Sequence, residues 1–234
     1  MPKLRKPGRG DVSVGRHKAV KLKKGKGRKA SSRRWLERQL NDPYVAEAKR
    51  RGYRSRAAFK LIELDDKFKF LRTGARIADL GAAPGGWTQV SLERAGSAGR
   101  VVGIDITPIE PIVGATLLTG DMREEVTEQD LIAALRGHAD VVLSDMAASS
   151  TGHAATDHLR IVGLIETALD FADLVLAPGG TFVAKVLQGG TERDLLTRLR
   201  RDFVKVAHAK PGASRKESAE MYVVAVGYRA YREL

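Results

Sequence analysis

Short apolar runs alternate with longer amphipathic segments over most of the chain beyond residue 74. Compact apolar runs bounded by glycine, proline and polar residues are typical of strands, and apolar residues spaced by about three and four positions are typical of helices. The pattern predicts seven strands, near residues 75–80, 100–105, 115–119, 140–145, 180–186, 203–209 and 221–228. Helices are predicted near residues 86–95, 127–136, 157–176 and 191–201. This alternation indicates an α/β fold with a mostly parallel sheet and helices on both faces.

The last two predicted strands follow each other without a helix between them. A parallel connection needs about a dozen residues, usually including a helix, whereas residues 211–220 have the character of a hairpin-like loop. We therefore expect the final strand to be antiparallel. Seven strands with the last one reversed do not fit the pattern of dinucleotide dehydrogenases.

Three short helices are predicted upstream of the first strand. The first covers residues 31–40, and Pro43 is well placed to begin the second, which Gly52 ends. Ser55 is placed to cap the third. We expect residues 31–234 to form one domain, with residues 31–70 as its N-terminal helical part.

Basic residues are concentrated in the N-terminal quarter. The first 60 residues hold 21 lysines and arginines against 4 aspartates and glutamates, whereas the remaining 174 hold 20 against 24. Residues 1–30 lack periodicity and apolar residues, which predicts a basic disordered arm. The arm could bind the phosphates of a polyanion, or it could be a solvated tail that serves only solubility. Its lysine and glycine content fits an organellar transit peptide less well.

Composition excludes several classes of protein. The chain has no cysteine, which rules out disulfides, zinc–thiolate sites and thiol catalysis. Its five histidines have no spacing typical of metal ligands, so no metal is expected. The chain contains neither a secretory signal nor an apolar stretch of about twenty residues, so we expect a soluble, cytoplasmic protein without a membrane partner. A monomer is the default expectation.

The chain is organised around the segment from Asp79 to Trp87, with the sequence Asp-Leu-Gly-Ala-Ala-Pro-Gly-Gly-Trp. It lies between a predicted buried strand and a predicted helix, which is how α/β proteins bring backbone close to a small ligand. Gly81 and Gly85 can adopt positive φ and have no Cβ to separate the backbone from a ligand. The segment matches neither the P-loop motif nor the G-x-G-x-x-G dinucleotide motif.

Acidic residues stand at or just after the ends of four consecutive predicted strands: Asp79, Asp105, Asp121 and Asp145. Ligands of open α/β sheets bind at the carboxyl ends of the strands. A carboxylate after the second strand suits two ribose hydroxyls, and Asp121 is placed to accept from an adenine amino group. Each acid alone could equally be a helix N-cap. Together they favour a cationic sulfonium, and hence S-adenosylmethionine over NAD, in a Rossmann-like class I methyltransferase fold.

Lys185 lies in an otherwise apolar predicted strand, near its carboxyl end. Buried lysines are rare unless they are paired, although a lysine that extends along the sheet edge to solvent is the alternative. Its position would place the amine in the same crevice as Asp145. Glu220, at the start of the last strand, would point there from the neighbouring side.

Five segments together resemble the FtsJ/RrmJ family of ribose 2′-O-methyltransferases, and in particular its bacterial members that act on 23S ribosomal RNA. The segments are Ser55–Leu61, Asp79–Trp87, Ser144–Ala147, Ala184–Val186 and Glu220–Tyr222. The similarity extends from about residue 31 to residue 228. After Asp145, however, the chain reads Met-Ala-Ala-Ser where the family usually has Met-Ala-Pro-Asn, which leaves the shape of that loop open.

This resemblance implies the function and the site residues. The family's Lys-Asp-Lys-Glu catalytic tetrad corresponds to Lys60, Asp145, Lys185 and Glu220. The family's S-adenosylmethionine contacts correspond to Gly85, Trp87, Asp105, Asp121 and Asp145, and we add Asp79 and Gly81 because they lie at the end of the first predicted strand. Apart from the resemblance, the positive charge of the N-terminal helical part makes Arg33, Arg34, Arg54 and Arg56 the candidate RNA contacts. The substrate would be a uridine of 23S ribosomal RNA in the large ribosomal subunit.

Alternatives remain at two levels. A transfer RNA 2′-O-methyltransferase of the same family would keep the fold and the tetrad, and a non-catalytic ribosome-assembly factor would keep only RNA binding. A nicotinamide-dependent oxidoreductase is disfavoured by the missing dinucleotide motif and the reversed last strand. In the chemistry, either a neutral Lys185 takes the proton of the 2′-hydroxyl, or a charged Lys185 stabilises the developing alkoxide.

Overall fold

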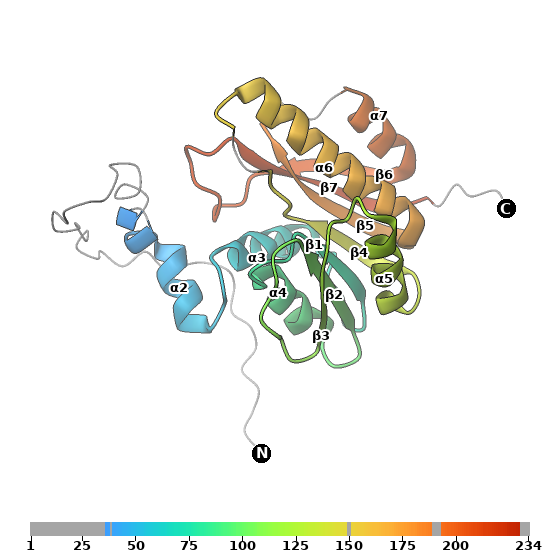
Figure 1. The fold of residues 1–234 in the computed structure, drawn as a ribbon, viewed down its shortest axis with the longest axis horizontal. Coiled ribbons are helices and arrows are strands. Elements are labelled where there is room, and N and C mark those ends of the chain that lie inside the picture. Colours follow the sequence, from blue (N-terminus) through green and yellow to red (C-terminus); the bar gives the residue numbers. More distant parts are fainter. Residues whose placement is uncertain (1–35, 38, 149–150, 189–192, 230–234) are drawn as a thin grey trace, which may run out of the picture.

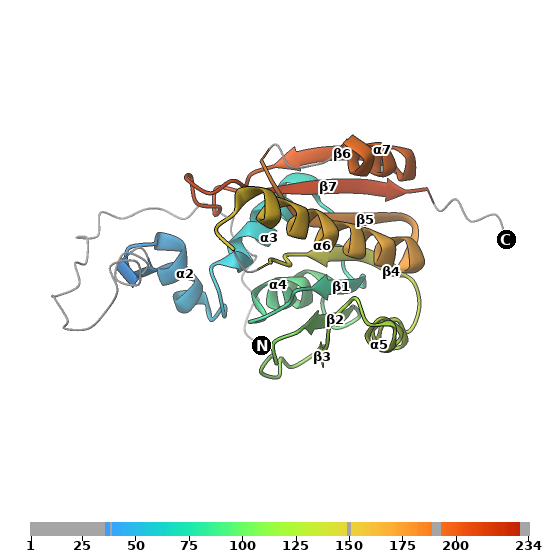
Figure 2. The same ribbon diagram turned by 45° about the horizontal axis from the view of Figure 1, so that its top comes forward.

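The structure, a computed structural model, describes residues 36–37, 39–148, 151–188 and 193–229. Its centre is one seven-stranded sheet with the order β3-β2-β1-β4-β5-β7-β6 (Figures 1 and 2). The strands are β1 (Arg76–Leu80), β2 (Arg100–Asp105), β3 (Ala115–Thr119), β4 (Ala139–Ser144), β5 (Leu176–Leu187), β6 (Phe203–Ala209) and β7 (Glu220–Tyr228). The neighbours from β3 to β5 pair in parallel, and β7 is antiparallel to both β5 and β6. The predicted fold class and the reversed last strand are confirmed.

Helices cover both faces of the sheet. They are α2 (Pro43–Arg51), α3 (Ala57–Phe68), α4 (Gly86–Ala95), α5 (Glu125–Leu135), α6 (Ala154–Val175) and α7 (Arg193–Asp202). Apolar residues of α5, α6 and α7 pack on one face, and those of α3 and α4 pack on the other. Successive strand residues alternate between the two layers; Val142 of β4 faces the first, and its neighbours Val141 and Leu143 face the second. This burial on both faces explains the continuous apolar runs in the sequence.

The N-terminal helical part differs from its prediction at one cap. Pro43 begins α2 and Gly52 ends it in a left-handed conformation, as predicted. Ser55 does not cap α3, because the N-cap position is taken by Arg56, which makes no capping bond through its side chain. The Ser55 hydroxyl is instead buried, 2.5 Å from where a Cβ on Gly86 would lie. Ser55 therefore fills the contact between the start of α3 and the glycine-rich turn.

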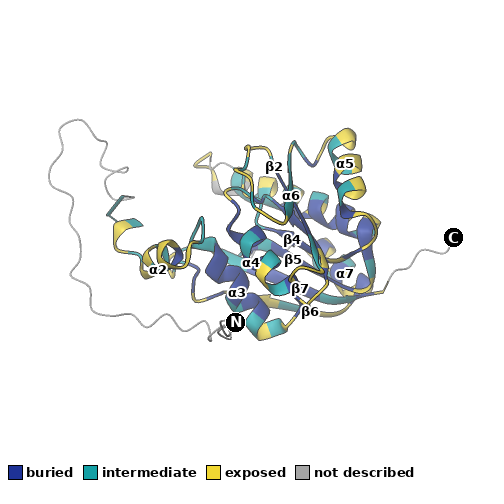
Figure 3. Ribbon diagram, turned by 90° about the horizontal axis from the view of Figure 1, so that it is seen from below, coloured by how far each residue is buried: buried dark blue, intermediate teal, exposed yellow. Residues whose placement is uncertain are grey.

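Seven of the twelve residues of α3 are buried, whereas α2 extends away from the sheet and carries many exposed residues (Figures 1 and 3). Of the predicted first helix, Leu36, Glu37, Gln39 and Leu40 are described, and these four are helical. The predicted basic arm of residues 1–30 lies outside the described residues. Within the described ranges, no helix combines the length and the apolarity needed to cross a membrane.

Candidate active site

The four residues of the implied tetrad lie together and are joined through a fifth side chain, that of Tyr222. Lys60 Nζ lies 2.7 Å from Glu220 Oε1 and donates to Glu220 Oε2 over 2.8 Å. It also lies 3.3 Å from the hydroxyl of Tyr222, which in turn donates to Asp145 Oδ1 over 2.8 Å. Lys185 Nζ lies 3.1 Å from the same carboxylate oxygen and donates to the Asp145 carbonyl over 2.6 Å. The result is one continuous polar chain from Glu220 to Lys185.

Strand register brings these residues together. In the antiparallel pair β5–β7, Lys185 is opposite Tyr222 and Leu187 is opposite Glu220. Glu220 and Tyr222 are two positions apart on β7, so their side chains share a face of the sheet. Asp145 directly follows β4, whose last residue pairs with the residue before Lys185. Helix α3 supplies Lys60 to this face, which explains why a residue so far away in sequence completes the site.

The side chains of the polar chain are largely shielded from solvent. The side chains of Lys60, Lys185, Asp145 and Glu220 are each less than one-fifth exposed. Burial would raise the pKa of Glu220, but the Lys60 ammonium, the Ser214 hydroxyl and the charge of Lys185 outweigh it and lower that pKa overall. Burial, together with the carboxylates of Asp145 and Glu220, raises the pKa of Tyr222 well above its usual value. Tyr222 is therefore a hydrogen-bond donor, and Glu220 an anion, at neutral pH.

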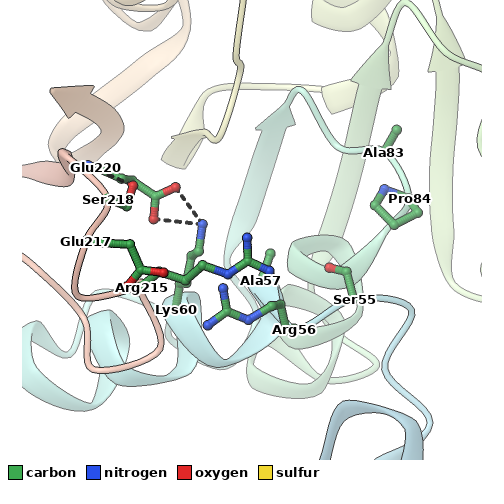
Figure 4. Close-up of a pocket in the computed structure, with 10 residues that line it drawn as sticks. All are labelled: Ser55, Arg56, Ala57, Lys60, Ala83, Pro84, Arg215, Glu217, Ser218 and Glu220. Atoms are coloured by element: carbon green, nitrogen blue, oxygen red, sulfur yellow. Dashed lines mark hydrogen bonds and ion pairs between the residues drawn. The ribbon is translucent and has the colours of Figure 1, made fainter. Parts of the chain in front are cut away.

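A pocket of about 490 Å³ opens beside the Lys60–Glu220 pair (Figure 4). Ala83 and Pro84 of the glycine-rich turn form one side of it, and the close-up places them across the pocket from Glu220. Arg56 and Arg215 also line it, and both guanidinium groups approach the same carboxylate oxygen of Asp42, at 2.9 and 3.9 Å from their Nε atoms. The pocket thus joins the polar chain, the turn and two cationic side chains.

The glycine-rich turn has the conformation that its glycines predict. Gly81 and Gly85 have φ values of 76° and 112°. A Cβ on Gly81 would lie 2.8 Å from the backbone nitrogen of Met146, so the turn passes directly against the segment that carries Asp145. Gly85 is the N-cap of α4, and the first backbone N–H groups of a helix lack intrahelical partners. A negatively charged ligand group would be favoured there.

Two residues of this segment are placed below the surface. Trp87 is 3% exposed, donates from Nε1 to the Ala57 carbonyl over 2.8 Å, and packs its ring 5.6 Å from that of Tyr222. Asp79 is completely buried and accepts from the Thr88 hydroxyl over 2.6 Å. Burial, despite the Thr88 bond and with support from neighbouring acids, raises the pKa of Asp79 to about 7. Both side chains are therefore buried between the glycine-rich segment and the rest of the domain.

The other two predicted acids, Asp105 and Asp121, are partly exposed. Asp105 accepts from the backbone nitrogen of Ala83 over 3.0 Å and from that of Thr107 over 2.8 Å, so it ties the turn to the β2–β3 loop. Asp121 binds the Arg123 side chain through both oxygens, and this contact lowers its pKa to about 2. Asp121 is thus an anion that already has a cationic partner.

The predicted RNA contacts fall into two groups. Arg33 and Arg34 lie outside the described residues. Arg54 donates from its guanidinium to three backbone carbonyls, and Arg56 pairs with Asp42 and donates to the Ala213 carbonyl. Of these two arginines, Arg56 is the one that lines the pocket.

Sequence reasoning missed three residues of the site. Tyr222 belongs to a segment quoted for its resemblance, and its spacing of two from Glu220 on a predicted strand was a signal that it shares that face. Ser214 donates to Glu220 Oε1 over 2.7 Å, and Arg215 lines the pocket, but both lie in a loop without periodicity. Among the described residues, no group of three or more histidine and acidic side chains could hold a metal ion.

Comparison with known proteins agrees with this geometry. The model of the FtsJ-like methyltransferase family matches residues 53–228. A protein from Acidiphilium cryptum named ribosomal RNA large subunit methyltransferase E is 63% identical over 92% of this chain and 94% of its own length. A protein of the same name from Paramagnetospirillum magneticum is 58% identical over 98% of this chain and 96% of its own. A crystal structure described as a ribosomal RNA methyltransferase from Plasmodium falciparum has a TM-score of 0.67 and 31% identity, and covers 75% of this chain and 98% of that one.

Proposed function

This chain belongs to the FtsJ-like methyltransferase family, and on that premise we propose that it methylates the 2′-hydroxyl of a uridine in 23S ribosomal RNA, with S-adenosylmethionine as methyl donor. The observation that carries the proposal is the polar chain from Glu220 through Lys60, Tyr222 and Asp145 to Lys185, next to the pocket. The proposed substrate form is the assembled large ribosomal subunit. The enzyme is proposed to act as a monomer, in the compartment where ribosomes are made.

The residues present fit S-adenosylmethionine. A Cβ at Gly81 would collide with the backbone of Met146, so only glycine lets the turn lie directly against the segment that carries Asp145. The N-terminus of α4 at Gly85 suits the carboxylate of the methionine part, and Trp87 would contribute its backbone N–H rather than its buried indole. Asp105 suits the ribose hydroxyls, since each carboxylate oxygen can accept a further bond. When bound, the cofactor supplies an electrophilic methyl group on a positively charged sulfur.

Positioning supplies much of the rate of such a transfer, because the attacking oxygen must be in line with the methyl carbon and the sulfur. Lys60 and Glu220 border the pocket, and we assign them the placement of the ribose. Asp145 fixes Lys185 through two acceptors, its carboxylate and its carbonyl. This leaves the third substituent position of Nζ for the 2′-hydroxyl.

Two routes for the proton fit this arrangement. In the first, Lys185 is an amine whose lone pair takes the proton of the 2′-hydroxyl as the oxygen attacks. In the second, the proton of the 2′-hydroxyl passes to water, and Lys185 is an ammonium whose third N–H stabilises the negative charge that develops on that oxygen. Both routes make Lys185 the essential member of the tetrad and Asp145 its positioning partner.

RNA would enter over the pocket. Arg56 and Arg215 are the two arginines that line it, and both approach the carboxylate of Asp42. We propose that they contact backbone phosphates, and that the RNA is recognised by its shape and its 2′-hydroxyls. Arg33 and Arg34 are proposed to extend this contact.

The test is methyl transfer from labelled S-adenosylmethionine to three substrates that lack the modification: large ribosomal subunits, free ribosomal RNA and bulk transfer RNA. We expect label in the subunits, on a 2′-oxygen of uridine. Label in transfer RNA alone would keep the fold and the tetrad but contradict the proposed substrate. Absence of label from all three would contradict the enzymatic assignment and favour a non-catalytic assembly factor.

A further inference from the structure

Arg54 lies in the short linker between α2 and α3, and its guanidinium bridges two segments of the cofactor side of the site. Its Nη1 donates to the carbonyl of Pro84 over 3.2 Å and to that of Glu110 over 2.6 Å. Its Nη2 donates to the carbonyl of Pro111 over 2.8 Å. Pro84 belongs to the glycine-rich turn, and the other two belong to the β2–β3 loop, residues 106–114. One side chain thus connects the turn to the loop.

The backbone of Arg54 is itself held in place. Gln89, on the first turns of α4, accepts from the Arg54 backbone nitrogen over 2.9 Å and donates to the Gly52 carbonyl over 2.9 Å. The linker is therefore fastened to the helix that begins at the glycine-rich turn. Because the backbone of Arg54 is fixed, its guanidinium can hold the loop in one position instead of moving with the loop.

The turn and the loop are already joined once, at their strand ends. Asp105 accepts from Ala83 of the turn and from Thr107 of the loop. Arg54 makes the second connection, farther from the strands. Two separated connections fix both the distance and the angle between two segments, whereas a single one acts as a pivot.

Packing around Gly85 agrees with this role. A Cβ on Gly85 would lie 2.6 Å from Ile112 Cδ1 of the loop and 3.2 Å from Arg54 Cδ, so loop, turn and arginine meet at this glycine. Elsewhere the loop is poorly covered, with Ile106 72% and Val113 100% exposed. Few apolar contacts would hold the middle of the loop in place without the two hydrogen bonds from Arg54 to Glu110 and Pro111.

We propose that Arg54 is a positioning residue for the methyl donor and not an RNA contact. Its guanidinium sets the β2–β3 loop against the glycine-rich turn. This rests on the proposed function, because it assigns the space between Asp105 and Gly85 to S-adenosylmethionine. A phosphate could bind the guanidinium fully only by displacing carbonyls that it already holds. Arg56, two residues on, is engaged as well, by Asp42 and by the Ala213 carbonyl, but it lines the pocket and is therefore the better placed of the two to meet RNA there.

The test compares Arg54→Met, which keeps the stem against Gly85 but removes the donors, with Arg54→Lys, which keeps the charge on a single donor group. Arg50→Met is the matched control, since Arg50 is exposed on α2 and binds Glu47. Four quantities are measured: the KM for S-adenosylmethionine, kcat at saturating cofactor, the calorimetric Kd for S-adenosylhomocysteine, and the Kd for ribosomal RNA.

For Arg54→Met we expect the KM for the cofactor and the Kd for S-adenosylhomocysteine to rise about tenfold, which corresponds to the loss of one or two charge-assisted hydrogen bonds. We expect kcat at saturating cofactor and RNA affinity to stay within about twofold of the wild type, and Arg54→Lys to fall between the two. Arg50→Met should leave cofactor KM and Kd unchanged. A merely structural role would lower kcat and thermal stability without this separation of KM from kcat.

A loss of RNA affinity in Arg54→Met with unchanged cofactor affinity would overturn the proposal and restore Arg54 as an RNA contact. Unchanged values throughout would overturn it as well. Should Arg54→Met fail to fold, Arg54→Lys decides the matter by its calorimetric Kd. Wild-type protein that binds no S-adenosylhomocysteine would instead overturn the proposed function itself, a result separate from any difference between variants.

Discussion

The hydroxyl of Tyr222 donates to Asp145 Oδ1 over 2.8 Å, and this bond joins the two halves of the proposed catalytic site. On one side Lys60, paired with Glu220, lies within 3.3 Å of the same hydroxyl; on the other, Lys185 is paired with Asp145. The raised pKa of Tyr222 keeps its proton in place at neutral pH, so the donor remains. Tyr222 therefore fixes the pair that we propose places the ribose relative to the lysine that we propose acts on the hydroxyl.

Replacing Tyr222 with phenylalanine should uncouple these halves while preserving the fold. The ring would still pack on Trp87, so cofactor affinity should stay within about twofold, but kcat should fall about tenfold with the loss of one hydrogen bond to a charged group. Single-turnover methyl transfer at saturating cofactor measures the effect. Tyr53→Phe, which removes a hydroxyl that donates to Glu93 away from the site, is the matched control and should retain wild-type kcat. An unchanged kcat in Tyr222→Phe would show that the link is dispensable.

Lys185 is predicted to be the residue whose removal costs most in rate. Lys185→Met keeps most of the side-chain volume but can neither take a proton nor stabilise a negative charge. We expect kcat to fall by about a hundredfold to ten-thousandfold, with cofactor affinity within about threefold of the wild type. Lys205 is an exposed lysine on the edge strand β6, and Lys205→Met should retain full activity. Undiminished turnover by Lys185→Met with bound substrate would end its assignment.

Gly81 is predicted to tolerate no side chain. Its φ of 76° disfavours other residues, and a Cβ would lie 2.8 Å from the Met146 backbone nitrogen and 2.9 Å from its Cα. Gly81→Ala should therefore lower the free energy of unfolding by about 2–4 kcal/mol and displace Asp145, whose backbone nitrogen donates to Leu80 next to the turn.

Urea unfolding and cofactor titration measure the two consequences of Gly81→Ala. The control is Gly163→Ala on α6, where a Cβ meets nothing within 4 Å. That change should stabilise the protein by about 0.5–1 kcal/mol, since alanine favours a helix interior. Equal stabilities of the two variants would contradict the steric explanation.

Burial of Asp79 predicts a specific dependence of stability on pH. Its pKa is about 7 in the folded protein against an ordinary value of 3.8, so between these pH values the folded state holds a proton that the unfolded state has released. Stability contributed by this group is therefore lost as pH rises from about 4 to about 7. Asparagine does not titrate, so the stability of Asp79→Asn relative to the wild type should rise over this window, by on the order of 2–4 kcal/mol.

Urea unfolding of both proteins at several pH values measures that slope. Asp130→Asn serves as the control, because Asp130 is exposed on α5. Its stability relative to the wild type should not change with pH. A flat difference for Asp79→Asn as well would mean that Asp79 is ionised in the folded protein.

The sheet was predictable from sequence to within a residue or two at most strand ends, because strands buried on both faces appear as uninterrupted apolar runs. The exception is β5, which begins at Leu176 rather than near residue 180 because its start pairs with Ala139. The reversed last strand followed from chain length alone, since no crossover fits between β6 and β7.

The site was less accessible to sequence reasoning. Strand positions already placed Lys185, Asp145 and Glu220 in one crevice, and the family resemblance added Lys60 and the catalytic roles. Only the three-dimensional register shows that Tyr222 joins them. Arginines between α2 and α3 were predicted as RNA contacts from their charge, but charge does not reveal that Arg54 uses its donors on backbone carbonyls. Ser55 was predicted as a cap from its residue type, whereas burial against Gly86 determines its place. In each case the deciding contact is with a residue more than 20 positions away.

The basic arm is predicted to bind RNA through charge alone. Deletion of residues 1–30 removes 12 lysines and arginines, and RNA affinity should then fall less steeply as salt rises, because fewer phosphates are neutralised. We expect the truncated protein to bind ribosomal RNA more weakly at low salt, with a slope of log affinity against log salt that is shallower by several units. The KM for S-adenosylmethionine should not change. A full-length variant with the 12 basic residues replaced by glutamine should match the truncation, because charge and not sequence is the cause. Identical salt slopes for the wild type and both variants would mean that the arm is a solvated tail without a part in RNA binding.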